Sequence, residues 1–395
     1  MFYRSILHYK QFRYLGAFYL HSLIRHFANS IFQIFNSIYI FQLLQKEGLD
    51  DSKALGITTI FFALVYLFQA LFIPFSLWLI KTKGLRFNIT WGNLMLISFL
   101  ISVYLAGYNI IFLVPAFILS GLQIALYWTA YHIYFAEVSD DKRQGEEVAL
   151  VMALSIIVGM GGPVLGGVLI NYWGFGAVFI MISILLLLSN LPMRHVSKEK
   201  DTVHIVLAEL IKTISSKKQR LSYLAIGGEA VIDTVDIYFW PLTIFLIVTG
   251  FITLGFIGSL VAFFSSIITI ILGKAIDKYG AKAVIRVISS LDSLIWISKA
   301  FITTPVQAYI ASIAQGATVS GQYMSLQAMI YEKVRHHNSI AFILQREITL
   351  SLGKVFFLVP MGILFWSGMP LAFIFIFAAA ATLFTRFYPE EKALT

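Results

Sequence analysis

The stretch 229–240 carries the residues whose types and spacing most clearly predict chemistry. Glu229, Asp233, Asp236 and Trp240 follow one another at i, i+4, i+7 and i+11, which places them along one face of a helix. Their neighbours are apolar, so we expect these carboxyl groups inside a membrane, where two ionised groups one turn apart are costly. Asp233 or Asp236 is therefore predicted to bind a proton or cation. The alternative is a structural salt bridge, which we favour for Glu229.

A second polar stripe lies early in the chain and consists of His21, Arg25, Asn29 and Asn36. The nearby sequence IYIF, at 38–41, resembles LTIF at 242–245. Aligning the two places Arg25 opposite Glu229 and Asn29 opposite Asp233. Because the signs of charge are opposite, Arg25 is predicted either to neutralise one of the acids in 229–240 or to bind an anionic substrate.

Further polar and aromatic side chains lie in two other apolar stretches: Gln123, Tyr127, Tyr131 and His132, then Gln322, Tyr323 and Gln327. Amide and aromatic groups suit a cavity for a solute that is partly polar and partly apolar. The alternative is that they fill contacts between helices, and His132 could also carry a proton. Arg346, Glu347 and Lys354 are predicted to pair with 229–240. We interpret Asp292 and Lys299 as structural, with Lys299 extending outward to the membrane surface.

The composition of the whole chain indicates the kind of structure that must hold these residues in place. Of the 395 residues, 59% are hydrophobic and 12% are charged, whereas soluble chains are roughly 45–50% apolar and about 25% charged. The surplus apolar surface must face lipid. Cysteine is absent, which excludes disulfides and thiolate metal sites.

A window of about 20 apolar residues, the length of a membrane-spanning helix, identifies about twelve candidates. They are Tyr14–Leu44, Ala54–Ile80, Phe87–Gly107, Ile110–Phe135, Val148–Ile170, Gly174–Leu191, Leu221–Val248, Ile252–Leu272, Val284–Phe301, Val306–Tyr331, Ile340–Trp366 and Met369–Phe387. We expect the first to be retained as a helix instead of being cleaved as a signal. The third and fourth are separated only by a break near Gly107 and Asn109.

The loops between these spans alternate in charge. One set is basic, and the other has only Lys46 and Lys53, both beside acidic residues. Basic loops stay in the cytoplasm, so both termini are predicted to lie inside and the protein to reside in the cell's inner membrane. The net charge of +9 is spread over every second loop, which argues against nucleic-acid binding.

The longest polar segment, 193–220, divides the spans into six and six. We therefore predict a six-helix bundle over 1–192, a cytoplasmic linker over 193–220 and a second six-helix bundle over 221–395. Within the linker, 202–215 has apolar residues at helical spacing, which indicates either an amphipathic helix on the membrane surface or a plain connection.

A motif after the eighth span supports a family resemblance. Gly273, Asp277, Lys278 and Gly280, in GKAIDKYGAK, resemble the loop signature of the major facilitator superfamily, in which the acid caps a neighbouring helix and the bases hold the cytoplasmic gate. The related stretch LIKTKGLRFNI after the second span keeps only Gly84 and Arg86 in register. The resemblance implies an all-α membrane protein with about twelve transmembrane helices in two pseudo-symmetric six-helix bundles.

A second motif lies in the fifth span. Gly162, Pro163, Gly166 and Gly167 form G-P-x-x-G-G, which resembles the fifth-helix motif of the antiporter branch of that family. The family pattern has a further glycine where this chain has Val158. Small residues there let helices approach closely. The alternative is that glycines are simply common in membrane helices.

Together these features predict a secondary transporter of a small organic solute, working by alternating access with proton-coupled efflux. The alternatives are a facilitator or importer of the same fold, an integral-membrane lipid enzyme, or a non-transporting receptor. Nucleotide, zinc and nucleophile motifs are absent from the sequence. We therefore expect no catalytic residues, no metal and no cofactor, and we expect a monomer whose partners are substrate, protons and lipid.

Overall fold

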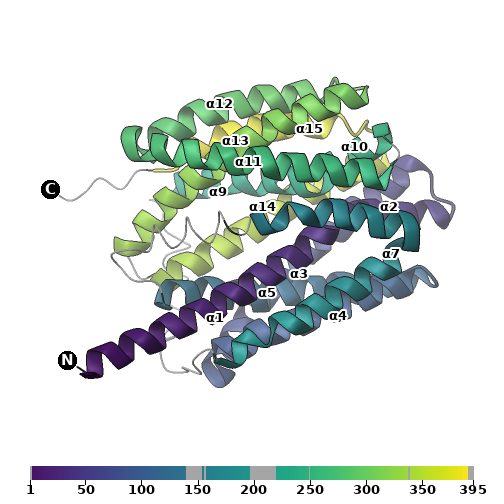
Figure 1. Ribbon diagram of the computed structural model, residues 1–395. Helices are drawn as coiled ribbons and strands as arrows, with labels where there is room; N and C mark the ends of the chain where they lie inside the picture. Colours follow the sequence, from purple (N-terminus) through teal and green to yellow (C-terminus); the bar gives the residue numbers. More distant parts are fainter. Residues whose placement is uncertain are drawn as a thin grey trace.

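The computed structural model describes residues 2–138, 154, 157–195, 219–248, 250–336 and 339–389. Over these residues the chain is helical, and the helices run side by side in one bundle, with the N-terminal end of α1 and the C-terminal end of α15 toward the same side (Figure 1). The predicted linker lies mostly outside the described residues, as do 148–153 of the predicted fifth span.

The first half of the molecule contains α1 (Phe2–Phe32), η1 (Gln33–Phe35), α2 (Asn36–Lys46), α3 (Asp51–Lys83), α4 (Leu85–Ala106), η2 (Ile110–Phe112), α5 (Leu113–Val138), α7 (Gly161–Ser189) and η3 (Pro192–His195). The second half contains α9 (Arg220–Thr234), η5 (Val235–Phe239), α10 (Trp240–Val248), α11 (Phe251–Tyr279), α12 (Ala281–Lys299), α13 (Pro305–His336), α14 (Ser339–Trp366) and α15 (Phe373–Thr385). In Figure 1 the first half lies mainly below the second.

Among the described residues, eight helical stretches are long and apolar enough to cross a membrane. One of them, Ile157–His195, is divided into two passes at Gly174, whose φ of 75° breaks the helix. Three further helices, α12, α13 and α15, bring the passes to the predicted twelve. The uncertain division between the third and fourth spans is confirmed, because α4 ends at Ala106 and η2 begins at Ile110.

The two halves share a turn that the sequence repeat predicts. Gly84 joins α3 to α4 with φ 90°, and Gly280 joins α11 to α12 with φ 81°. A positive φ is strained for a residue with a side chain, so glycine is favoured at both turns. The aligned sequences LIKTKGLRFNI and AIDKYGAKAVI thus fold into equivalent helix–turn–helix corners.

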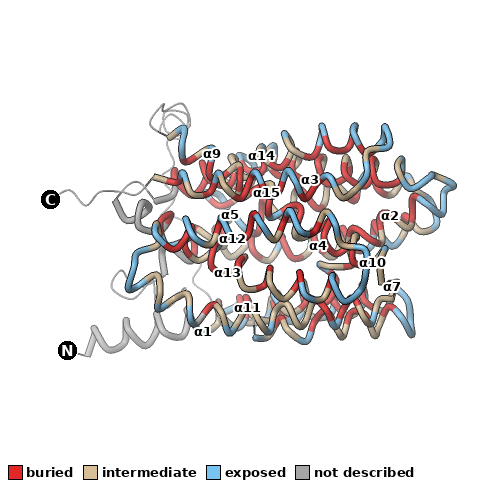
Figure 2. Tube along the Cα trace, turned by 90° about the horizontal axis from the view of Figure 1, so that it is seen from above, coloured by how far each residue is buried: buried red, intermediate tan, exposed pale blue. Residues whose placement is uncertain are grey.

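The halves pack through small residues. In α3, a methyl group added at Gly56 would lie 2.9 Å from the carbonyl oxygen of Gly362 in α14. In α7, one added at Gly167 would collide with the backbone of Phe251 in α11. Lipid supplies no hydrophobic drive for helix association, so this close packing must contribute much of the stability. Buried residues are concentrated along these contacts, and exposed ones face outward (Figure 2).

The first and seventh spans, which both contribute to the centre of the molecule, are interrupted at related levels. The first span changes to a 3₁₀ turn at η1, and the seventh changes to a π-helix at η5. With Ile38 aligned to Leu242, η1 falls opposite the later part of η5. The hydroxyl of Ser37 donates to the carbonyl oxygen of Tyr238 at 2.7 Å, which joins the halves there. Such interruptions often mark hinges or functional sites.

Candidate functional site

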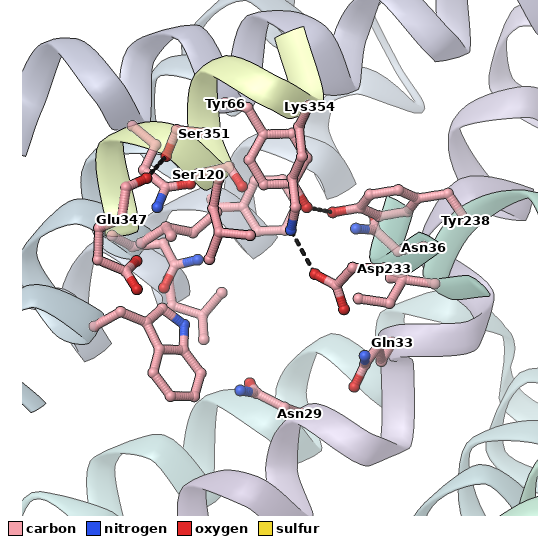
Figure 3. A pocket seen from close by; sticks show the side chains of 18 of the residues that line it. Asn29, Gln33, Asn36, Tyr66, Ser120, Asp233, Tyr238, Glu347, Ser351 and Lys354 are labelled. Atoms are coloured by element: carbon pink, nitrogen blue, oxygen red, sulfur yellow. Dashed lines mark hydrogen bonds and ion pairs between the residues drawn. The ribbon is translucent and has the colours of Figure 1, made fainter. Parts of the chain in front are cut away.

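A cavity of about 380 Å³ lies between the two halves. Eight of the residues predicted to do chemistry line it: Arg25, Asn29, Asn36, Gln123, His132, Glu229, Asp233 and Tyr323. In Figure 3, Asn29 and Gln33 face it from the first span, and Asp233 and Lys354 meet on the other side. The cavity has the size and mixture of polar and apolar groups that are typical of a small-molecule site.

The most accessible acid in this cavity is Asp233 of α9. Its side chain is 48% exposed, and Oδ2 accepts a hydrogen bond of 2.6 Å from Nζ of Lys354 in α14. Lys354 itself is buried and lies 4.5 Å from the ring centroid of Tyr66 in α3. Both members of this ion pair line the cavity and the acid is the more exposed of the two, so the pair can respond to what enters the cavity.

A second ion-pair group lies deeper in the wall. Arg346 of α14 donates from Nη2 to Oε1 of Glu229 at 2.8 Å and from Nη1 to Oε1 of Glu347 at 3.1 Å. Nε2 of His132, from α5 of the first half, lies 3.7 Å from the same oxygen of Glu347. The pairing of α14 with the seventh span, expected from sequence, is present, and it includes an ion pair at Glu229.

Arg25 has different surroundings from those predicted. Its guanidinium donates to Oδ1 of Asn93 and, at 3.0 Å, to Oε1 of Gln123, and it lies 3.4 Å from the ring centroid of Tyr127. Asn93 is in turn held by Ser189 and Asn190 of α7 and its C-terminal cap. Arg25 is thus fixed by neutral groups of its own half, and the acids it was expected to neutralise are paired with Arg346 and Lys354 instead.

The predicted stripe in 229–240 is divided, which corrects the helical-wheel expectation. Glu229 and Asp233 line the main cavity, but Asp236 faces a smaller one and Trp240 packs inside the second half. The physical reason is the π-helix at Val235–Phe239, which inserts extra residues per turn and rotates the following face. Tyr238 consequently lines the main cavity, and its hydroxyl lies 2.9 Å from that of Tyr66.

Other predicted cavity residues support the wall from behind. Nδ1–H of His21 donates a hydrogen bond of 2.7 Å to the carbonyl oxygen of Ser189, and Tyr127 lies beneath Arg25. Tyr131 stacks against Tyr127. Gln322 donates to Thr385 at 3.0 Å beside the smaller cavity, and Gln327 is buried in α13. None of these lies among the residues that line the main cavity.

Lys299 also departs from expectation. It was predicted to extend outward, but it is 1% exposed and lies between the rings of Trp240 and Trp296. Asp292, on the same helix, is fully buried as well. The reason is that α12 packs between α13 and α15, so the face that carries both residues points into the second half.

The motif residues lie where close packing or a turn requires them. A methyl group added at Gly162 or Gly166 would collide with Ser30 or Ile31 of α1, whereas Gly167 and Pro163 face α11. One face of the motif therefore packs α7 against α1 in the first half. Another face packs α7 against α11 in the second half. Gly273, Asp277, Lys278 and Gly280 lie at the end of α11, where Lys278 extends over the ring of Tyr279 at 4.9 Å.

Sequence reasoning did not select several residues that line the cavity: Gln33, Tyr66, Gln69, Ser120, Tyr238 and Ser351. Gln33 and Gln69 could have been found, because each is an amide inside an apolar span. Tyr66 and Tyr238 carry no such signal, since tyrosines are also common where helices pack. Within the described residues no cluster of histidine and acidic side chains could hold a metal ion.

Comparison of the sequence with known protein families identifies a family for this chain. The family model for the Major Facilitator Superfamily matches residues 19–254, more than half of the chain. The MFS-type transporter ppzB of the fungus Metarhizium rileyi is 28% identical over 111 residues, which are 28% of this chain and 23% of that protein. The chain thus matches less than a quarter of the length of this relative.

Solved structures agree with the fold. A D-xylose-proton symporter matches with a TM-score of 0.73 at 14% identity, covering 96% of this chain and 98% of that one. The xylose transporter XylE from E. coli, in an inward open conformation, matches with a TM-score of 0.67 at 13% identity over 98% and 97%. A bacterial homologue of the human peptide transporters PepT1 and PepT2 gives 0.66 at 12% identity over 95% and 96%.

Proposed function

The chain belongs to the major facilitator superfamily, and from that premise we propose that it is a secondary active transporter of a small organic solute, coupled to protons. The two halves would rock about the central cavity and expose it to each side of the membrane in turn. The observation that carries the proposal is the ion pair between Asp233 and Lys354, which lines the cavity and in which the acid is far more exposed than the base.

The pair offers a way to couple a proton to movement. Protonation of Asp233 would remove its charge and release Lys354, whose ammonium group would then need another partner inside the wall. α9 and α14 belong to the second half, and Lys354 contacts Tyr66 of α3 in the first half. A change in the position of Lys354 would therefore alter the contact between the two halves. Proton occupancy could thereby bias which side of the cavity is open.

The lining favours a solute with both polar and apolar parts and little net charge. The described acids of the wall have cationic partners, and Arg25 is held by two amides. The groups that remain to meet a solute include the amides Asn29, Gln33 and Asn36, and the ring of Trp128. Amides and aromatic rings bind hydroxyl groups, peptide groups or uncharged rings.

The ligand can be identified first, and its coupling to protons can then be tested. A thermal-shift panel on the purified protein would include D-xylose, a dipeptide and an aromatic amine, and the compound that stabilises it would be used in proteoliposomes. We expect an imposed pH gradient to drive its accumulation by wild type, and Asp233→Asn or Asp236→Asn to abolish accumulation but keep exchange. Asp51→Asn, at an exposed position at the start of α3, is the matched control. Accumulation that ignores the gradient, or that survives in both variants, would refute coupling through these acids.

We propose outward transport because the G-P-x-x-G-G motif resembles that of the antiporter branch. Uptake is the second candidate, since one matching solved structure is described as a proton symporter. Proteoliposomes with an inside-acidic or an inside-alkaline gradient separate the two. Antiport predicts solute accumulation on the acidic side, and symport predicts accumulation on the alkaline side.

The proposed orientation has both termini and the linker 193–220 in the cytoplasm of a cell's inner membrane. The alternation of basic loops supports it. The chain has no native cysteine, so a single cysteine at Ser197, which lies outside the described residues, can be tested with a membrane-impermeant reagent. Labelling of intact cells from outside would contradict this orientation.

A further inference from the structure

We propose that Asp236, Lys299 and Asp292 form a proton-binding site inside the second half, separate from the substrate cavity. The site would load and release one proton in each transport cycle. This inference deepens the proposed function, and its place in the cycle rests on that function. Proton binding itself can be measured without any transported substrate.

The first observation is the state of Lys299 at the end of α12. Its ammonium nitrogen is buried and has no hydrogen-bond partner among the described residues. It lies 3.8 Å from the ring centroid of Trp296 and 4.1 Å from that of Trp240. Two aromatic faces stabilise a cation but do not replace water, so nearby negative charge is needed. Asp236 and Asp292 are the carboxyl groups that interact with it electrostatically.

The two acids differ in how they are held. Asp292 accepts three hydrogen bonds, from the Thr318 hydroxyl at 2.5 Å, the Trp296 indole nitrogen at 2.9 Å and the Thr382 hydroxyl at 3.1 Å. An ionised carboxylate accepts hydrogen bonds only, so this arrangement stabilises the ionised form. Asp292 is therefore the fixed counter-ion of Lys299.

Asp236 is held far less completely. Among the described residues only the amide of Gln315 donates a hydrogen bond to it. Asp236 lies in the π-helix η5 and lines a small cavity of about 60 Å³, which shares Glu229, Asp233 and Tyr323 with the main cavity. Asp236 is thus the member of the group that a proton arriving from the main cavity can reach.

The count of charges supports one exchangeable proton. With both acids ionised and Lys299 charged, the group has a net charge of −1, and one added proton makes it neutral. A net charge inside a membrane protein is costly, so the neutral form is favoured there. A metal cation is disfavoured because Lys299 already supplies a positive charge that interacts with both acids. The reaction is dissociation of the Asp236 carboxylic acid, with its proton passing to water in the small cavity.

Other charged or titratable groups face Asp236 as well. Asp233 lies on its own span and adds negative charge, which Lys354 of α14 offsets. Glu229 and the phenol of Tyr323 line the same small cavity, and Arg346 neutralises Glu229. The ion pairs around the main cavity thus stay balanced while Asp236 exchanges its proton.

Infrared difference spectroscopy of the full-length protein in lipid, recorded between acid and alkaline pH, tests the site directly. Wild type should show a protonated carboxylic acid band that shifts in D₂O and disappears as pH rises. Asp236→Asn should remove that band, and Asp51→Asn should not. Thermal unfolding of each variant shows whether it is folded.

Three further variants distinguish this site from a merely structural group. Lys299→Met removes the cation, so the band should persist to a pH at least about one unit higher, a tenfold change in proton affinity. Asp292→Asn removes a like charge, so the midpoint should move to lower pH. Lys299→Arg should restore the wild-type midpoint. A band that survives in Asp236→Asn, or that moves in the same direction or not at all in Lys299→Met and Asp292→Asn, would overturn the proposal.

The proposed function is tested separately. If a pH gradient drives accumulation by wild type and by Lys299→Met and Asp292→Asn alike, this group plays no part in the cycle, although proton coupling itself stands. If wild-type transport ignores the gradient while the infrared pattern holds, coupling is wrong but the proton site is supported. We expect the infrared pattern and impaired gradient-driven accumulation together.

Discussion

The two halves share a fold but place their charges differently. In the first half the cavity wall carries one described cation, Arg25, and neutral amides hold it. Glu47, Asp50 and Asp51 of that half lie away from the cavity, between the end of α2 and the first residue of α3. In the second half, three acids and two bases of the wall form ion pairs on α9 and α14. Under the proposed coupling, the wall of the first half keeps a constant charge, and that of the second half changes its charge when a proton binds.

The largest effect should come from breaking the ion pairs of the second half. Arg346→Gln leaves Glu229 and Glu347 buried without their cation, which typically costs about 3–5 kcal/mol. We expect a large loss of folded protein, measured as yield and thermal stability after purification. Arg346→Lys should restore only part of the stability, because an ammonium group does not provide the guanidinium fork. If Arg346→Gln were as stable as wild type, the wall of the second half would not depend on its ion pairs for stability, and the contrast with the first half would fail.

The next largest effect should come from disrupting helix packing, and it should differ between a contact within one half and a contact between the two halves. Gly162 packs on Ser30 of its own half, whereas Gly167 packs on Phe251 of the other. Overpacking costs roughly 1–3 kcal/mol. Gly162→Leu should therefore reduce stability, and Gly167→Leu should slow transport at least about tenfold at comparable yield. Equal effects of both variants on transport and on yield would remove the distinction.

A smaller effect is expected at Arg25. Arg25→Gln keeps an amide donor near Asn93 and Gln123 and leaves no acid unpaired, so the loss should be near 1 kcal/mol, the value of a typical hydrogen bond. We expect ligand affinity to fall while a pH gradient still drives transport. Thermal stability and gradient-driven accumulation would be measured beside Arg346→Gln. A loss of stability as large as that of Arg346→Gln would show that Arg25 neutralises an acid after all.

Much of the fold could be predicted because membrane insertion leaves a strong pattern. Apolar stretches of the right length gave the twelve passes, and the repeated turn sequences gave the equivalent corners at Gly84 and Gly280. The level of the cavity could also be predicted, since intramembrane polar residues such as Asn29 and Asp233 are costly unless they face one. These features can be predicted because each depends on residues that are close together in the sequence.

What could not be predicted depends on contacts between distant segments. A regular helix places Asp236 and Trp240 on the face of Asp233, and nothing in 229–240 indicates the π-helix that separates them. Likewise, the hydropathy of α12 does not reveal whether Lys299 points to lipid or into the second half. Its neighbour Trp240 is 59 positions earlier in the chain, and the proximity exists only after folding.

The smallest effect is expected at the acids that the first half keeps outside the membrane. Asp50 caps α3, accepting a hydrogen bond of 2.9 Å from the backbone nitrogen of Lys53 and pairing with its ammonium group at 2.8 Å. The hydrogen bond from the Lys53 side chain, then that from its backbone, lowers the pKa of Asp50 below its ordinary value of 3.8. Because the folded-state pKa is depressed, the cap's contribution is present above pH 3.8 and is lost as pH falls through the lower, folded-state value.

Asp50→Asn isolates that contribution, because asparagine keeps the cap but loses the charge. We expect amide hydrogen exchange at Lys53 and Ala54 to be slightly faster than in wild type at neutral pH, and the two proteins to converge as pH falls below 3.8 and through the lowered pKa of Asp50. Asp51→Asn should show no such convergence. The ion pair is exposed, and solvent screening keeps such pairs weak, so global stability should hardly change. A loss of stability at neutral pH comparable to that of Arg346→Gln would mean that this loop, too, depends on buried charge, and the contrast between the halves would fail.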